Sequence, residues 1–316
     1  MQQRINVSAS ARNLGAGALT IAMLAALTAC GGDGGNTATA TVTSMNVAAT
    51  KYGTPALVTI VGTNLSNLNL QASGCKNITR LTASPTASSD TTAYFQCTPS
   101  GAYSSSIIAI SNGGTISSQT LTVPAPIVTM TASGGGVNGS IVFNLKGNVA
   151  PITVDNFLAY VNMTPSFYVG TIFHRVVDMT NTLDGPEYDV IQGGTYGAAT
   201  SGTLPAAKTG TLDPIALETT GGTNVQWTAA MARTSAANSA TSGFFFNVKN
   251  NTGAFDTTSG PGYAVFADVS GSQAILTQIA AIGQGGSTVC TPLSGFTDGS
   301  CVPIPNVIIT SAVQTQ

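Results

Sequence analysis

The sequence predicts a mainly β protein whose two domains follow an N-terminal export signal. Short runs rich in β-branched and aromatic residues recur along the chain, and Gly, Pro, Ser or Asn bound them, as is typical of strands joined by turns. A chain of 316 residues is long enough for two domains that each bury a core. The first 30 residues are typical of a targeting segment and are not counted as part of either fold.

The composition excludes several classes of function. Only 7% of the residues are charged, and the formal net charge is -2. A nucleic acid is therefore not an expected partner, because binding a phosphate backbone requires a basic surface. The chain has 1 histidine, which excludes zinc sites built from several histidines. We expect neither a metal nor a cofactor.

Residues 1–29 are typical of a secretory signal peptide. Arg4 and Arg12 supply the positive start, and residues 15–27 form an apolar stretch that is short for a membrane span. The segment ends in Leu-Thr-Ala followed by Cys30, which resembles the lipobox of bacterial lipoproteins. The resemblance implies that Cys30 carries the acyl chains and anchors the protein at the periplasmic face of the bacterial cell envelope. Gly31 favours the outer membrane, by analogy with lipoprotein sorting in enteric bacteria.

The other four cysteines fall into two local pairs, Cys75 with Cys97 and Cys290 with Cys301. Each pair would close a short loop in an oxidising, exported compartment, so we predict two disulfides. A Cys-x-x-Cys spacing is absent from the sequence, and a thioredoxin-like redox role has no support.

The first predicted domain covers residues 41–123 and follows a flexible tether at residues 30–40, which is rich in Gly, Asn, Thr and Ala. Three strand-like runs occur in it: residues 56–62, 93–97 and 106–111. Strands of this length and spacing predict a small β-sandwich. Residues 53–65, which end in Gly-Thr-Asn-Leu, resemble the immunoglobulin-like repeats of the IPT/TIG kind. The resemblance implies a binding module or a spacer, and the sequence leaves both open.

A domain boundary is expected at Pro124 and Pro126, because two prolines so close together stiffen the chain and interrupt strand pairing. We expect a linker over residues 124–136 and the second domain over residues 137–316. Residues 139–145 alternate between apolar and polar side chains, which predicts a half-buried strand.

Residues 150–161 are predicted to form a helix. Thr153 is placed to cap its N-terminus, and Asp155 is favourable in the first turn. One apolar face recurs at the helical spacing i, i+3, i+4 and i+7: Val154, Phe157, Leu158 and Val161.

Residues 170–177 form the next predicted strand, which contains His174 beside Arg175. An arginine among apolar neighbours is rarely buried without a partner or a task. Another strand is expected at residues 189–194, after a polar loop. Because neighbouring strand residues point to opposite faces, we expect His174 to be a buried, hydrogen-bonded residue and not a general base.

Six blocks of the second half occur in an order typical of one family. They are Ala-Pro-x-Thr-Val-x-Asn-Phe from residue 150, Gly-Thr-Ile-Phe-His-Arg-Val from 170, Val-Ile-Gln-Gly-Gly from 190, Ala-Met-Ala-Arg-Thr from 230, Ser-Ala-Thr-Ser-Gly-Phe-Phe-Phe-Asn-Val from 239 and Gly-Tyr-Ala-Val-Phe from 262. The set resembles the bacterial branch of the cyclophilin-type peptidyl-prolyl isomerases. This resemblance implies a closed eight-stranded antiparallel β-barrel capped by two helices. Residues 272–282 fit the second helix, because Ile275, Ile279 and Ile282 recur on one face.

By this resemblance the protein isomerises Xaa-Pro bonds, and Arg175 is the residue that stabilises the twisted amide. A guanidinium suits this role because its donors are fixed in geometry and always charged. Phe245 is implied as the aromatic floor under the proline ring and Gln192 as the amide that positions the substrate backbone, whereas Phe244 and Phe246 are expected in the barrel core. The other implied substrate-binding residues are Phe173, Val190, Met231, Ala232, Arg233, Phe255 and Tyr263.

Three departures from the family pattern predict a weakened isomerase. The connection at residues 178–189 is longer than in the family pattern. The family's pocket phenylalanine is missing there: Asp189 occupies its aligned position, and Tyr188 could supply an aromatic ring in its place. Gly243 stands in place of a glutamine, and Ala254 in place of a bulky apolar residue. These changes reduce the proline pocket without affecting Arg175 or Phe245.

Three functions are therefore compatible with the sequence. The first is a membrane-anchored isomerase acting on proline-containing exported proteins, since uncatalysed isomerisation takes tens of seconds and can limit folding. The second is a cyclophilin-like module that binds proline-containing segments without turning them over. The third is a structural lipoprotein in which both domains are spacers. Arg175, Gln192 and Phe245 together favour the first, and the altered connection favours the second.

Overall fold

The computed structural model describes residues 39–48, 50–100, 104–111, 114–177, 189–198, 207–219, 221–256, 260–283, 290–292 and 300–316. The expected signal peptide, Cys30, most of the tether and Tyr188 lie outside these residues. Within the described ranges, every helix is too short or too polar to cross a membrane.

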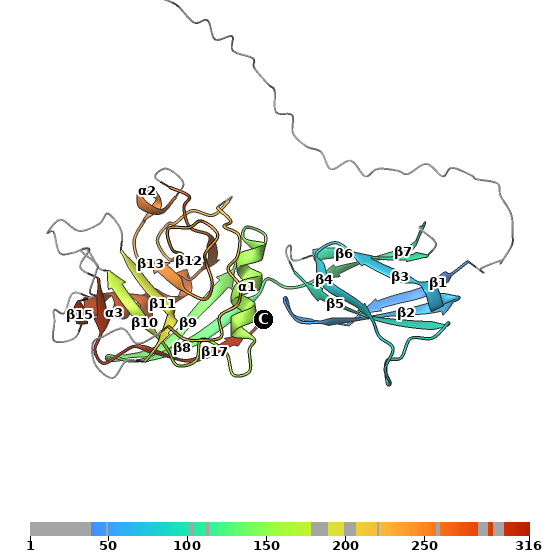
Figure 1. The fold of residues 1–316 in the computed structure, drawn as a ribbon, viewed down its shortest axis with the longest axis horizontal. Helices are drawn as coiled ribbons and strands as arrows, with labels where there is room; N and C mark the ends of the chain where they lie inside the picture. Colours follow the sequence, from blue (N-terminus) through green and yellow to red (C-terminus); the bar gives the residue numbers. More distant parts are fainter. Residues whose placement is uncertain are drawn as a thin grey trace, which may run out of the picture. The chain divides into compact units, whose positions relative to one another are not determined.

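The N-terminal part of the chain folds into two antiparallel sheets (Figure 1). The first contains, in spatial order, β1 (Thr41–Val47), β2 (Ala56–Thr63), β5 (Thr92–Pro99) and β4 (Cys75–Arg80), and the second contains β3 (Asn69–Ala72), β6 (Ser104–Ser111) and β7 (Gly114–Thr122). Val58 and Ile60 of β2 are fully buried while their neighbours are less so, as expected for a strand with one face on a core. The short 3-10 helix η1 (Leu65–Asn67) follows Asn64, whose φ of 57° turns the chain at the Gly-Thr-Asn-Leu sequence.

The C-terminal part is a closed barrel of eight antiparallel strands, as expected. The strands are β8 (Ile127–Gly134), β9 (Val137–Leu145), β10 (Thr171–Val177), β11 (Val190–Gly197), β12 (Thr228–Met231), β13 (Phe244–Asn247), β14 (Val265–Asp268) and β17 (Ile308–Gln314). Their order is β11-β13-β12-β14-β9-β8-β17-β10, and the ring closes because β10 also pairs with β11. A hairpin of β15 (Cys290–Pro292) and β16 (Cys301–Pro303) continues the sheet from β10.

Residues 127–134 differ from expectation, because they form β8 instead of part of a linker. β8 pairs with β9 along its full length and with β17 on its other edge. Alternate residues Val128, Met130 and Ala132 are buried in the barrel core. The two prolines at 124 and 126 therefore precede the first barrel strand, and the glycines at 134–136, all with positive φ, make the β8–β9 turn.

Two longer helices accompany the barrel, α1 (Pro151–Val161) and α3 (Gln273–Gly283), together with the short α2 (Thr252–Phe255) and the 3-10 helix η2 (Ser270–Ser272). The predicted apolar face of α1 is buried. The predicted cap is wrong, because α1 starts at Pro151 and lacks a side-chain cap at Ala150. The carboxylate of Glu218 instead accepts hydrogen bonds from the backbone N–H groups of Ile152 and Thr153, at 3.1 and 2.7 Å. The helix N-terminus is thus satisfied by a residue distant in sequence.

Both predicted disulfides are present. Cys75–Cys97 links β4 to β5 with the Cα atoms 5.5 Å apart, and Cys290–Cys301 links β15 to β16 with the Cα atoms 5.4 Å apart. Cys290 and Cys301 are buried, 3% and 5% exposed. The second disulfide therefore cross-links the two strands of the hairpin that extends the barrel sheet from β10.

Candidate active site

The predicted site lies on a row of residues that are paired across four neighbouring strands of the barrel. Arg175 on β10 lies opposite Gln192 on β11, Gln192 lies opposite Phe245 on β13, and Phe245 lies opposite Ala230 on β12. Directly paired residues on neighbouring strands project from the same face of a sheet. Four residues from four different strands are thereby brought together on the outer face of the barrel.

The outer face is distinct from the barrel interior. Phe245 belongs to a small apolar cluster with Val177, Val190 and Val265, whereas Phe244 and Phe246 belong to the main core. Both core phenylalanines contact the ring of Phe143, at centroid distances of 5.7 and 5.4 Å. The expected alternation of the Phe-Phe-Phe run is confirmed.

A shift in pairing register decides where Arg175 points. Phe173 lies opposite Gly193 and Arg175 lies opposite Gln192, so two residues of β10 span one step of β11 and His174 is the extra residue of a bulge. Without the bulge, Phe173 and Arg175 would share a face. With it, Phe173 packs inside the barrel against Phe246, at a centroid distance of 6.0 Å, and Arg175 lies outside.

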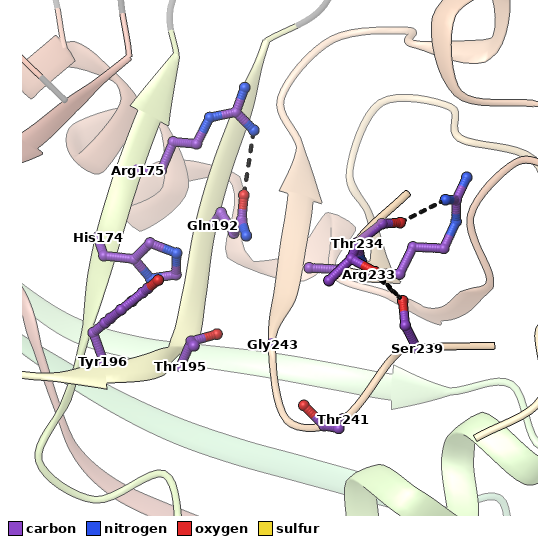
Figure 2. Close-up of a pocket in the computed structure, with 11 residues that line it drawn as sticks. His174, Arg175, Gln192, Thr195, Tyr196, Arg233, Thr234, Ser239, Thr241 and Gly243 are labelled. Atoms are coloured by element: carbon purple, nitrogen blue, oxygen red, sulfur yellow. Dashed lines mark hydrogen bonds between the residues drawn. The ribbon is translucent and has the colours of Figure 1, made fainter. Parts of the chain in front are cut away.

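Hydrogen bonds to two of the described residues hold the Arg175 guanidinium. Its Nη1 donates to Oε1 of Gln192 at 3.2 Å, as Figure 2 shows, and its Nε donates to Oγ of Ser300 at 2.8 Å. Arg175 is half-buried, and Ser300 is 3% exposed. The guanidinium is thus held at the edge of the sheet by one partner on β11 and another just before β16.

Beside Arg175 lies a cavity of about 310 Å³, which we call the aromatic cavity. The rings of Phe245, Phe255 and Tyr263 meet edge to face, with centroids 5.1–5.3 Å apart. Every lining residue is one that the sequence singles out: Arg175, Val190, Gln192, Ala232, Arg233, Phe245, Phe255 and Tyr263. The other two sequence-predicted residues, Phe173 and Met231, lie in the barrel core and line neither this cavity nor its neighbour.

Arg233 has a structural place at the rim of the aromatic cavity. Its guanidinium carbon lies 4.5 Å from the ring centre of Tyr263. Its Nε donates to the carbonyl of Gly262 at 2.8 Å, and its Nη1 donates to the carbonyl of Thr234 at 2.8 Å. These contacts tie the segment after β12 to the segment before β14 and hold the Tyr263 ring against the cavity.

A second cavity of about 230 Å³ adjoins the first and shares Arg175, Gln192, Ala232 and Arg233 with it. Gly243 is part of its wall (Figure 2). A Cβ atom at this position would lie 2.7 Å from Oγ1 of Thr195. A side chain at position 243 would therefore clash with Thr195 as it lies here, and Gly243 is not part of the wall of the aromatic cavity.

The remaining departures lie beside the aromatic cavity. Asp189 does not line it, because its carboxylate lies 3.7 Å from Nζ of Lys249 and its backbone is bound by Asn251. The Asn251 side chain accepts from the N–H of Asp189 and donates to its carbonyl, at 3.1 and 2.9 Å. Ala254 is also absent from the lining. The next residue of α2, Phe255, supplies an aromatic wall of the cavity.

His174 is buried, at 4% exposure, and its ring contacts Tyr196 edge to face at 4.6 Å (Figure 2). Burial lowers the pKa of His174 to about 4, while the backbone carbonyl of Ile172 opposes this change. The ring is therefore neutral at neutral pH. The expected burial is confirmed, and the ring has a hydrogen bond with the backbone of Ile172, whereas its Nδ1 lacks a partner among the described residues.

Ser300 and Asn251 are site-supporting residues that the sequence does not single out. Ser300 is 125 residues from Arg175, and its only local signal is its position before Cys301. Asn251 follows a polar stretch after β13, where asparagine is common in turns. Both act through contacts that only the folded chain creates.

An always-charged group beside a small aromatic cavity on a closed β-barrel defines a site suited to a neutral, partly apolar group with a carbonyl acceptor. Comparison with known proteins agrees with this class. A family model described as cyclophilin type peptidyl-prolyl cis-trans isomerase/CLD matches residues 127–313. The chain therefore belongs to the cyclophilin-type peptidyl-prolyl cis-trans isomerase family, and its enzyme class is that of the prolyl isomerases.

Curated bacterial relatives support the same assignment. The chain is 39% identical over 178 residues to the peptidyl-prolyl cis-trans isomerase cyp18 of Streptomyces antibioticus, covering 55% of this chain and 92% of that protein. It is 39% identical over 143 residues to an isomerase of Acinetobacter baylyi, covering 45% and 67%. It is 37% identical over 154 residues to isomerase B of Escherichia coli, covering 48% and 84%.

Proposed function

We propose that the protein accelerates the cis–trans isomerisation of Xaa-Pro bonds in exported polypeptides, with Arg175 as its catalytic residue. The observation that carries the proposal is the Arg175 guanidinium held beside the cavity formed by Phe245, Phe255 and Tyr263. A proline ring is small and apolar, and the carbonyl next to it is a hydrogen-bond acceptor. The aromatic cavity can hold the proline ring, and the Arg175 guanidinium can donate a hydrogen bond to the carbonyl.

The chemistry requires no nucleophile, because no covalent bond is made or broken. The barrier of roughly 18–20 kcal/mol to peptide rotation arises from the lost resonance between nitrogen and carbonyl. In the twisted amide the nitrogen has a localised lone pair that can accept a hydrogen bond, which the planar ground state cannot do. A fixed, charged donor stabilises the twisted state more than the planar one, and this difference is what accelerates the reaction.

Each part of the site has a role in this proposal. The three rings hold the proline ring while the chain before it rotates. Gln192 orients Arg175 through its Oε1 atom and leaves its amide nitrogen for the substrate backbone. His174 supplies no proton, because it is neutral and buried. The reaction rate should therefore not depend on a titrating base.

Export and membrane anchoring form the second part of the proposal. The signal-like residues 1–29 and the lipobox-like Cys30 support it, as do the two disulfides, which are typical of oxidising compartments. A Cys30→Ser variant should move from the membrane fraction to the soluble periplasmic fraction. If the wild type is already recovered in the soluble fraction, the anchoring proposal is wrong.

Exchange spectroscopy on a short peptide with one Xaa-Pro bond tests the catalytic proposal. The full chain should produce cis–trans exchange cross-peaks that are absent without enzyme. Arg175→Ala should lower the exchange rate at least about tenfold, the effect of losing one charged hydrogen bond. Arg80→Ala is the control, because Arg80 belongs to the N-terminal sheet and lines neither cavity. Peptide peak shifts without exchange would instead establish a binding module that does not catalyse.

A further inference from the structure

The Cys290–Cys301 hairpin places one buried hydroxyl against Arg175. Ser300 directly precedes β16 and is 3% exposed. Its Oγ accepts a hydrogen bond of 2.8 Å from Nε of Arg175. This bond is shorter than the 3.2 Å bond between Arg175 Nη1 and Gln192 Oε1. Ser300 is therefore the nearer of these two partners of the guanidinium.

The position of Ser300 is restrained through the residue that follows it. The next residue, Cys301, lies opposite Val176 of β10, the neighbour of Arg175. Cys301 is also joined by the disulfide to Cys290, and β15 pairs with β16 at three successive positions. Cross-linking and strand pairing together restrict the backbone at Ser300 to the place where its hydroxyl reaches Arg175.

The geometry gives this hydroxyl a specific effect on the guanidinium. The bond from Nη1 reaches Gln192 on β11, and the bond from Nε reaches Ser300 just before β16. Because the donors of a guanidinium are rigidly related to one another, bonds from two of its nitrogens to two different segments together restrain the plane of the group. A fixed plane presents its donors to the substrate in one orientation, which is the condition for stabilising a transition state efficiently.

We propose that Ser300 is a positioning residue for the isomerase reaction, and that the Cys290–Cys301 hairpin sets the activity by holding Ser300 against Arg175. This inference rests on the proposed catalytic role of Arg175. It adds an element outside both cavities to the determinants of the reaction rate.

Kinetics of variants of the full chain test the inference. Ser300→Ala should lower kcat about tenfold and leave KM unchanged, because the bond orients a group that acts in the transition state. Ser272→Ala is the matched control. Ser272 is also a buried serine, 5% exposed, and its Oγ accepts a 2.8 Å bond, but from the backbone N–H of Val142. It lines neither cavity, so its kcat should equal that of the wild type.

The hairpin is tested with its own control pair. Replacing Cys290 and Cys301 together by alanine should lower kcat to the level of Ser300→Ala, and adding Ser300→Ala should cause no further loss. Replacing Cys75 and Cys97 by alanine should leave kcat unchanged, because that disulfide lies in the N-terminal sheet. Circular dichroism of each variant separates loss of fold from loss of rate.

A direct readout uses the Nε–H proton of Arg175 in arginine labelled with ¹⁵N. Its exchange with water should be slow in the wild type and in Ser272→Ala, and faster in Ser300→Ala. The inference is overturned if Ser300→Ala keeps wild-type kcat, or if the two disulfide variants lose kcat equally. Those results leave the proposed function intact so long as Arg175→Ala is slow. Equal rates for wild type and Arg175→Ala would refute the proposed function itself.

Discussion

Adjacent phenylalanines on β13 should separate catalysis from stability. Phe246 is fully buried and its ring centroid lies 5.4, 6.0 and 5.5 Å from those of Phe143, Phe173 and Phe244. Phe246→Leu should lower the free energy of unfolding by about 1–2 kcal/mol, because it removes ring atoms from a packed core. It should not change kcat/KM of the folded enzyme, since Phe246 lines neither cavity.

Phe245→Leu should have the opposite effect. Its ring lines the aromatic cavity and, although only 4% exposed, packs in a small apolar cluster outside the barrel core, so its loss should cost less stability than the loss of Phe246, about 1 kcal/mol or less. The proline ring loses an aromatic contact worth about 1 kcal/mol, which corresponds to a roughly fivefold fall in kcat/KM. Urea unfolding and peptide exchange rates measure the two quantities. A fall in kcat/KM for Phe246→Leu as large as for Phe245→Leu would refute the division of the strand into two faces.

Three further predictions concern the scaffold. Glu218→Ala should lower stability to urea by about 1–2 kcal/mol, because the N–H groups of Ile152 and Thr153 lose their acceptor; Asp213→Ala, in the same segment, is the comparison. Gly194→Ala should be destabilising by about 2–4 kcal/mol in urea, since a Cβ would lie 2.8 Å from the Phe244 ring at a φ of +82°, whereas Gly170→Ala, at +81° in open space, should cost only about 1–2 kcal/mol. The folded-state pKa of His174 is about 4, which lies below the unfolded value of 6.5. The contribution of neutral His174 to the free energy of unfolding should therefore be complete above pH 6.5 and should decrease by about 3 kcal/mol as the pH falls from 6.5 to 4. Urea unfolding at pH 7 and pH 4 checks this, and a His174→Phe variant with the same pH dependence would contradict it.

The faces of individual residues could be predicted from the sequence where the backbone is regular. Alternation in the Phe-Phe-Phe run correctly separates Phe245 from its neighbours, because that strand is regular. The helical spacing of α1 likewise identifies its buried face. The spacing of apolar residues is a local property of the sequence, and where the backbone is regular it is enough to predict which side chains are buried. The family resemblance adds the closure of eight antiparallel strands into a barrel, which local pattern does not contain; the order of the strands comes from the structure.

Contacts between distant segments could not be predicted in the same way. Glu218 binds the N-terminus of α1 across 65 residues, and Ser300 binds Arg175 across 125. Thr153 satisfies the local rule for a cap, but the tertiary carboxylate provides stronger, charged acceptors for the same N–H groups. A proline pair at residues 124 and 126 marks a boundary, yet only the pairing partners of β8 show that residues 127–134 are a barrel strand.

Because of the bulge at His174, the sequence identifies the residues of the site but does not predict the face of the strand on which each one lies. Strict alternation through Phe173-His174-Arg175 would place Arg175 beside Phe173 in the barrel interior, where burying a guanidinium among apolar side chains is energetically costly. The extra residue in β10 reverses the face, so that Phe173 fills the core and the guanidinium reaches Gln192 and Ser300. No glycine or proline in that segment signals the bulge. The cost of burying the charge selects it, and the same irregularity that moves Phe173 out of the site brings Arg175 into it.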